Sequence, residues 1–182
     1  MMLTKEKYNK VVLPGLMEKF GYKNQMAAPR LTKVTLNIGV GKSQKDPKHS
    51  EVIINTLQRI SGQKPAATKA KKSIAAFKIR EGMIVGYKVT LRGQRMYDFL
   101  DRMMTIALPR VRDFHGLDPK KHIDQQGNLS IGFKEHIIFP EIKSDEVEKL
   151  HGLEVAVTTT AKKREEGFEL FRLLGTPFKQ IK

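Results

Sequence analysis

The chain has 182 residues, 34 Lys and Arg against 19 Asp and Glu, a formal net charge of +15 and an isoelectric point near 10.0. A hydrophobic fraction of 40% is enough for a buried core, and the lack of cysteine excludes disulfide scaffolds, thiolate nucleophiles and cysteine-based metal sites. The longest stretch without a formal charge, residues 125–133, is far shorter than the ~20 residues of a membrane span, so we expect one cytoplasmic domain over residues 1–182.

The N-terminal elements follow from hydrophobic spacing. Residues 4–20 have apolar side chains at helical spacing, and Pro14 predicts that this helix is kinked or split. Residues 31–39 alternate between apolar and polar side chains, which predicts a half-buried strand whose polar face carries Lys33 and Asn37.

A second helix is expected to begin at Pro47 and to end at Gly62. A short strand is expected near residues 66–71. Residues 73–82 lack sustained alternation and end in glycine, so we expect a loop with little to fix it in the unbound protein.

The next strand is expected over residues 85–92, with Lys88, Thr90 and Arg92 on its polar side. A helix with apolar residues at helical spacing follows and is expected to stop at Pro109.

The C-terminal part is predicted to contain two more strands and a helix. Residues 129–133 and 153–159 alternate as strands, and residues 165–174 form a helix that Gly175 ends. Residues 111–128 are rich in turns and give no clear pattern. The mixture lacks a regular βαβ rhythm, which predicts an α+β fold with a mainly antiparallel sheet. If helices cover one face of this sheet, the other face is open.

Basic residues are clustered, which favours a nucleic-acid partner because each neutralised phosphate releases counterions. Residues 64–95 contain nine basic residues and one acid, Glu81. Residues 135–154 instead contain six acids against two lysines, which indicates a second kind of partner.

No motif indicates catalysis. The five histidines show no metal-ligand spacing and are expected to be surface or loop residues, and Ser130 lacks the glycine of a nucleophile elbow. We therefore expect no catalytic residue, metal or cofactor. The alternatives are an RNA-modifying or RNA-processing enzyme and a membrane-surface module, and no acid–base cluster or amphipathic basic helix supports either.

Residues 57–73 run from a helix end into a basic strand. Local composition alone fits a phosphate-tracking edge and an ordinary basic helix terminus equally well. Together with residues 71–82, 88–93, 106–114 and 137–142, this segment resembles the 5S-rRNA-binding ribosomal protein family, the fifth of the bacterial large-subunit series.

The resemblance implies a curved antiparallel sheet with helices on one face and an open RNA-binding face. It also implies 5S rRNA, large-subunit rRNA, P-site tRNA, neighbouring large-subunit proteins and a basic small-subunit head protein as partners. The expected RNA-binding residues are Lys33, Asn37, Gln63, Lys64, Lys69, Lys71, Lys88, Thr90 and Arg92.

The same resemblance assigns residues 73–82 to P-site tRNA. The expected contacts there are Ser73, Phe77, Lys78 and Arg80. The alternative is that Phe77 and Ile79 pack into the protein's own core. The bridge to the small subunit is expected at Glu141, Asp145, Glu146 and Glu148.

Overall fold

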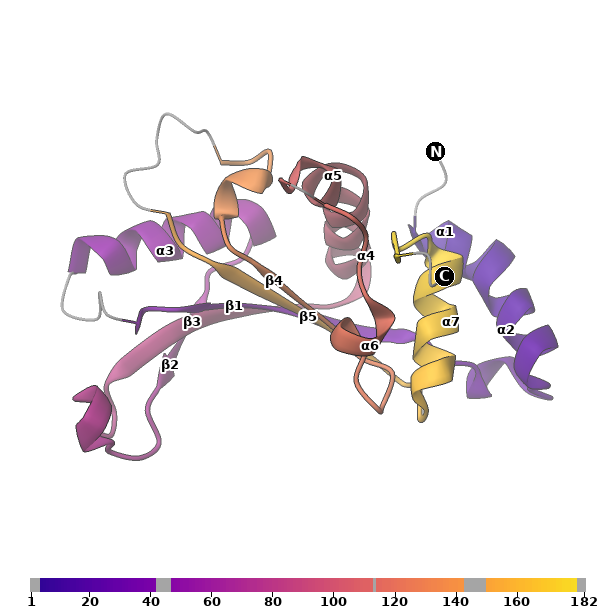
Figure 1. The fold of residues 1–182 in the computed structure, drawn as a ribbon, viewed down its shortest axis with the longest axis horizontal. Helices are drawn as coiled ribbons and strands as arrows, with labels where there is room; N and C mark the ends of the chain where they lie inside the picture. Colours follow the sequence, from indigo (N-terminus) through magenta and orange to yellow (C-terminus); the bar gives the residue numbers. More distant parts are fainter. Residues whose placement is uncertain (1–3, 42–46, 113, 143–149, 180–182) are drawn as a thin grey trace. The chain divides into compact units, whose positions relative to one another are not determined.

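The computed structural model describes residues 4–41, 47–112, 114–142 and 150–179. Five strands form one antiparallel sheet that does not close into a barrel, in the order β2-β3-β1-β5-β4, and helices complete an α+β fold, as predicted (Figure 1). The strands are β1 Leu31–Gly39, β2 Ala66–Lys69, β3 Ile84–Leu91, β4 Leu129–Phe133 and β5 Leu153–Thr159.

The chain forms two compact units. The first contains Met1–Val34, Leu91–Ile131 and Ala156–Lys182, and the second contains Thr35–Thr90 and Gly132–Val155. The expectation of a single domain over residues 1–182 stays a prediction. The helices and helical turns of the first unit are α1 Thr4–Lys7, η1 Tyr8–Val12, α2 Leu13–Phe20, η2 Gln25–Ala27, α4 Gly93–Arg102, η5 Met103–Ala107, α5 Leu108–Arg110, α6 Pro119–His122 and α7 Arg164–Leu174. Those of the second unit are α3 Pro47–Ser61, η4 Ala75–Phe77 and η6 His136–Ile138.

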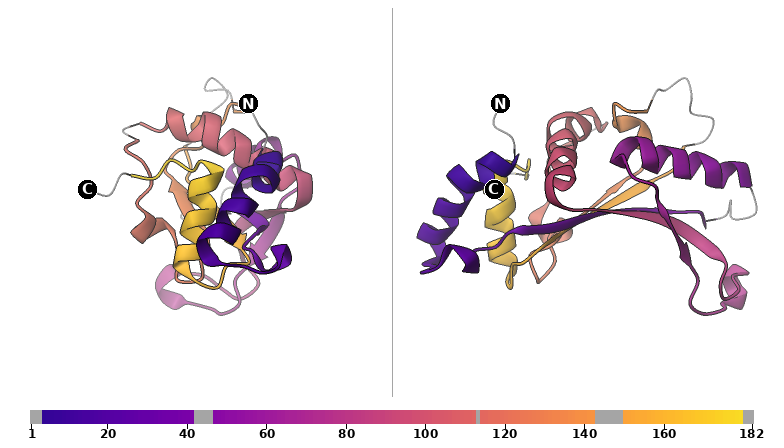
Figure 2. Two further views of the ribbon diagram at one scale, coloured as in Figure 1. Left: turned by 90° about the vertical axis from the view of Figure 1, so that its right-hand side faces the viewer. Right: turned by 180° about the vertical axis from the view of Figure 1, so that it is seen from behind.

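In the second unit, α3 lies along one face of the strands, and the hairpin of β2 and β3 extends away from that face (Figures 1 and 2). The apolar stripe of α3, formed by Ile53, Leu57 and Ile60, is at most 1% exposed. Because side chains alternate along a strand, the apolar residues of β1 and β3 turn toward this helix and their polar neighbours turn to the other face. The predicted division of these strands into two faces is confirmed.

In the first unit, α2 packs on α7, and α1 packs on α4. Two π-helical turns, η1 and η5, each lie directly before a short helix whose first turn contains a proline, Pro14 or Pro109. A proline ring collides with the carbonyl four residues earlier, and a wider turn relieves this collision. The helix therefore continues to Arg110, and the expectation that it stops at Pro109 is wrong.

Candidate nucleic-acid interface

The uncovered face of the second unit, which we call the outer face, carries short polar side chains. It contains Thr35 and Asn37 of β1, Lys88 and Thr90 of β3, and Glu154 of β5. Lys88, Thr90 and Glu154 are exposed, while Thr35 and Asn37 are half-buried. No helix in the described part of this unit lies on the outer face (Figures 1 and 2). The result is a surface of hydroxyl, amide, ammonium and carboxylate groups held on adjacent strands.

The backbone at Gly86 lies close to the neighbouring strands β1 and β2, and Gly86 itself adds no side chain to the outer face. A Cβ atom on Gly86 would lie 2.7 Å from the Ile38 carbonyl oxygen and 3.1 Å from Thr68 Oγ1. Thr68 pairs with Gly86 and Ala66 with Lys88 across the β2–β3 ladder. Because the cross-strand partner of Lys88 is the small residue Ala66, the aliphatic part of the Lys88 side chain is accessible on the outer face.

Glu154 is a site residue that sequence analysis did not place on this face. Asn37 Nδ2 donates to Glu154 Oε2 at 3.4 Å, which aligns the amide with a carboxylate of the neighbouring strand. A carboxylate repels phosphate, so this pair gives Asn37 a protein partner that an RNA group would have to replace. The alternation of residues 153–159 was the signal that could have shown the orientation of Glu154.

The remaining predicted RNA-binding residues lie at several places. Gln63 is half-buried just after α3, where Gly62 has φ +67° and Gln63 N donates to Ser61 Oγ at 3.2 Å. Lys64, Lys69 and Lys71 are exposed on or beside β2, which ends at Lys69, two residues earlier than expected. Two residues belong to the first unit: Lys33 is half-buried on β1, and Arg92 is the exposed N-cap residue of α4.

Residues 73–82, which we call the hairpin tip, close on themselves. Ile74 N donates to Ile79 O at 2.9 Å, Ile79 N donates to Ile74 O at 3.2 Å, and Glu81 N donates to Ser73 Oγ at 3.0 Å. Lys78 takes a left-handed conformation with φ +55°, which lets η4 turn back within this bridge. The segment contains no strand, as predicted for a loop, but the backbone bridge between the two isoleucines gives it internal contacts that the sequence did not indicate. Its order in the unbound protein stays a prediction.

The hairpin tip presents apolar surface to solvent. Phe77 is 72% exposed and Ile74 is 45% exposed, so the alternative in which Phe77 packs into the core is wrong. Lys78 and Arg80 are also exposed, which combines an aromatic ring with two cations at one end of the hairpin.

The predicted bridge residues are only partly described. Glu141 is half-buried, and Asp145, Glu146 and Glu148 lie outside the described residues.

Three histidines meet on the covered side of the second unit and are buried there, although the sequence predicted surface or loop residues. His49, His136 and His151 are 7%, 1% and 8% exposed. The rings of His136 and His151 are stacked with centroids 3.8 Å apart, and His49 meets His151 edge-on at 6.3 Å. Their wide separation in the sequence hid this cluster, because only the fold brings α3, η6 and the segment just before β5 together.

Burial lowers the pKa of two of these histidines, His136 and His151. Desolvation lowers the pKa of His151 to about 4, with a further lowering by the charge of His136, and desolvation also lowers the pKa of His136. Both rings are therefore neutral at pH 7. Among the described residues, no group of three His, Cys, Asp or Glu side chains is arranged to hold a metal ion.

No described helix is long and apolar enough to cross a membrane.

Comparisons with known proteins cover almost the whole chain. The family model of ribosomal protein L5 matches residues 24–80, and the model of the C-terminal part of the same ribosomal family matches residues 84–178. The large ribosomal subunit protein uL5 of Halothermothrix orenii is 51% identical over 180 residues, covering 99% of this chain and 100% of the relative. The uL5 proteins of Thermoanaerobacter sp. (strain X514) and Caldanaerobacter subterraneus subsp. tengcongensis are 53% and 55% identical over 174 residues, covering 96% of this chain and 97% of each relative.

Proposed function

Because the chain belongs to the ribosomal protein L5 family and is a structural constituent of the large ribosomal subunit, we propose that its outer face holds 5S rRNA. Members of this family are structural components of the cytoplasmic ribosome and not enzymes, and their partners are rRNA and other ribosomal components.

One observation carries the proposal for 5S rRNA: the outer face combines uncovered strands with short polar groups and a nearby basic edge. Asn37 and Thr90 supply amide and hydroxyl groups for RNA sugars and bases, while Lys64, Lys69 and Lys88 are exposed for phosphates. Nucleic-acid contacts divide in this way between positioning through phosphates and hydrogen bonding to individual groups.

The test compares two chemically identical substitutions. Asn37→Ala removes an amide from the outer face, whereas Asn55→Ala removes an exposed amide from α3, on the covered side. We expect Asn37→Ala to weaken 5S rRNA binding by about 1–3 kcal/mol and Asn55→Ala to leave it unchanged, measured by filter binding at fixed salt. Equal effects of the two substitutions would contradict the assignment.

Binding should also depend steeply on salt. With roughly five phosphate contacts, the logarithm of the association constant should fall by several units per tenfold increase in salt. A flat response would exclude a phosphate-driven interface, whatever the effect of Asn37.

We further propose that the hairpin tip contacts P-site tRNA. Lys78 and Arg80 would pair with phosphates, and the exposed ring of Phe77 would lie on a ribose or an unstacked base. Replacing residues 75–81 with a short Gly/Ser linker should leave folding and 5S rRNA binding intact. Ribosomes that carry the replacement should retain P-site tRNA less firmly, and unchanged retention would contradict the proposal.

A third proposal concerns the acidic residues. Phosphate repels them, so they suit a basic protein of the small-subunit head. Changing Asp145, Glu146 and Glu148 to lysine should weaken subunit association in sucrose gradients and spare 5S rRNA binding. Normal association would leave these acids as a solvated surface.

A further inference from the structure

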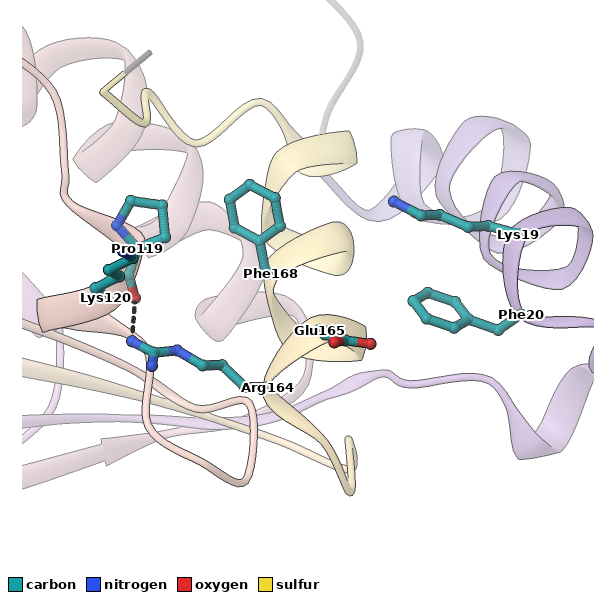
Figure 3. A pocket seen from close by; sticks show the side chains of 7 residues that line it. All are labelled: Lys19, Phe20, Pro119, Lys120, Arg164, Glu165 and Phe168. Atoms are coloured by element: carbon teal, nitrogen blue, oxygen red, sulfur yellow. Dashed lines mark hydrogen bonds between the residues drawn. The ribbon is translucent and has the colours of Figure 1, made fainter. Parts of the chain in front are cut away.

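A surface hollow of about 410 Å³ lies in the first unit, between the end of α2, the start of α6 and the first turns of α7 (Figure 3). Its chemistry differs from that of the outer face, since its lining combines two phenyl rings with three cations and one carboxylate.

Two phenyl rings give the hollow flat apolar surfaces. Phe168 of α7 and Phe20 of α2 both line it, and both are half-buried. The ring of Phe178 lies 5.1 Å from that of Phe168, and the ring of Tyr22 lies 6.0 Å from that of Phe20. Each lining ring is therefore supported by a second aromatic side chain.

Three cations surround these rings. Lys19 Nζ lies 2.7 Å from Glu169 Oε2, yet the Lys19 side chain remains 52% exposed. Arg164 Nη2 donates to the Pro119 carbonyl oxygen at 2.8 Å, which fixes its guanidinium beside α6, and Lys120 is exposed at the same edge (Figure 3). The cations at the edge of the hollow can thus bind a phosphate while the flat apolar face of a ligand packs on the phenyl rings.

One carboxylate distinguishes the hollow from a plain anion site. Glu165 lines it and is exposed. A carboxylate repels a phosphate placed next to it, but it accepts hydrogen bonds from the amino group of cytosine, adenine or guanine. Uracil offers no amino group.

We propose that this hollow binds one unstacked RNA nucleotide whose base carries an amino group. The base lies against Phe168 or Phe20, its amino group donates to Glu165, and the adjoining phosphate pairs with Lys120 or Lys19. Aromatic faces beside cations are the usual means of holding single-stranded nucleic acid. A purely acidic peptide would use the cations but neither the rings nor Glu165. The inference rests on the family's rRNA partnership and not on the proposed role of the outer face.

Photo-crosslinking of the full chain tests the proposal without relying on a variant. The probes are ten-nucleotide cytidine and uridine RNAs, each with one 5-iodo base, and mass spectrometry maps the crosslinks. We expect the cytidine probe to crosslink to Phe168 or Phe20 more strongly than the uridine probe. Crosslinks that lie only elsewhere would overturn the proposal, and equal yields for the two probes would overturn the recognition of an amino group.

Matched variants then separate the contributions. Phe168→Leu keeps an apolar side chain and should weaken cytidine-probe binding at the hollow about tenfold, and Glu165→Gln should remove the preference for cytidine.

Lys120→Gln should lower the crosslink yield. Lys121 is an exposed neighbour on α6 outside the lining, so Lys121→Gln should leave the yield unchanged. Equal effects of these two lysine changes, or unchanged binding by Phe168→Leu, would contradict the proposal. An acidic peptide such as deca-aspartate that displaces the cytidine probe more effectively than unlabelled cytidine RNA would assign the hollow to protein instead.

The crosslink also distinguishes the two RNA proposals. Asn37→Ala should retain the crosslink at Phe168 or Phe20 even where it weakens 5S rRNA binding. Loss of the crosslink in Asn37→Ala would show that the two sites are not independent.

Discussion

On the covered face of the second unit, Leu36, Ile38 and Val89 are at most 3% exposed, whereas their neighbours Lys88 and Thr90 reach solvent on the outer face. The same two strands therefore carry opposite chemistry at alternate residues. The covered face holds an apolar stripe of α3 and three buried histidines, and the outer face holds small polar groups around Gly86.

This difference separates stability from binding. Burial of apolar area under α3 stabilises the second unit, and the outer face contributes little to that burial. Substitutions on the covered face should change the free energy of unfolding, and substitutions on the outer face should change RNA affinity.

The largest effect is expected from Leu57→Ala on the covered side. Leu57 is 0% exposed, so its truncation leaves a cavity and should lower the free energy of unfolding by about 2–5 kcal/mol, measured by urea denaturation. Asn55→Ala on the same helix is the control and should change it by less than about 0.5 kcal/mol. A loss of 5S rRNA affinity by folded Leu57→Ala protein would break the division between the faces.

The next effect concerns pH. The folded pKa of His151 is lowered to about 4 while the unfolded chain keeps the ordinary 6.5, so between these values the unfolded chain binds more protons. The free energy of unfolding should therefore fall by about 2–3 kcal/mol as the pH falls from 7 to 4.5. The charged groups that act on these rings are His136 and His49, which lower the pKa of His151, and Glu135, which raises the pKa of His136.

Comparison with a variant isolates the histidine contribution. Denaturation of His151→Gln, taken relative to its own value at pH 7, should lose less stability on acidification than the unchanged chain. Parallel pH curves for the two proteins would show that His151 does not carry the effect.

On the outer face, hydroxyl and ammonium groups should act differently. Thr90→Ala should weaken 5S rRNA binding by about 1–3 kcal/mol with little change in salt dependence. Lys88→Gln should reduce the slope of log affinity against log salt by up to about one unit. If both substitutions change the salt slope by the same amount, the assignment of hydrogen bonding to Thr90 and of phosphate pairing to Lys88 is wrong.

The smallest effect on stability is expected at the hairpin tip. Phe77 is 72% exposed, so Phe77→Ala should change the free energy of unfolding by less than about 0.5 kcal/mol, in contrast to Leu57→Ala. A loss of several kcal/mol in the same urea titration would instead place the ring in a core.

Local patterns were sufficient for most of the fold. The alternation of residues 31–39 predicted β1 with its observed bounds, and Gly175, with φ +95°, ends α7 as expected. Helix α6 was not predicted, because Pro119–His122 is too short for an apolar period to be visible. Its signal was the pair of Asp118 as N-cap and Pro119 at the first turn.

The candidate site was less accessible to sequence analysis. Strand parity placed Asn37 and Thr90 on one face, but it gave no sign that Asn37 would hydrogen-bond to Glu154, which is distant in sequence. The histidine cluster and the hollow beside Phe168 also join segments that only the tertiary fold brings together. Patterns along the chain indicate periodicity and local turns. Contacts between distant segments depend instead on which helices, strands and loops the fold brings next to each other.

The bridge between Ile74 and Ile79 has a consequence for molecular recognition. Fixing a backbone residue in one conformation costs about 1–2 kcal/mol of conformational entropy at 25 °C, and in the hairpin tip this ordering accompanies folding of the chain itself. A partner that meets Phe77 and Lys78 therefore finds them preorganised, and its affinity is not reduced by the ordering of a ten-residue coil. A small contact area at the tip can thus give a higher affinity than the same contacts on an unordered segment would give.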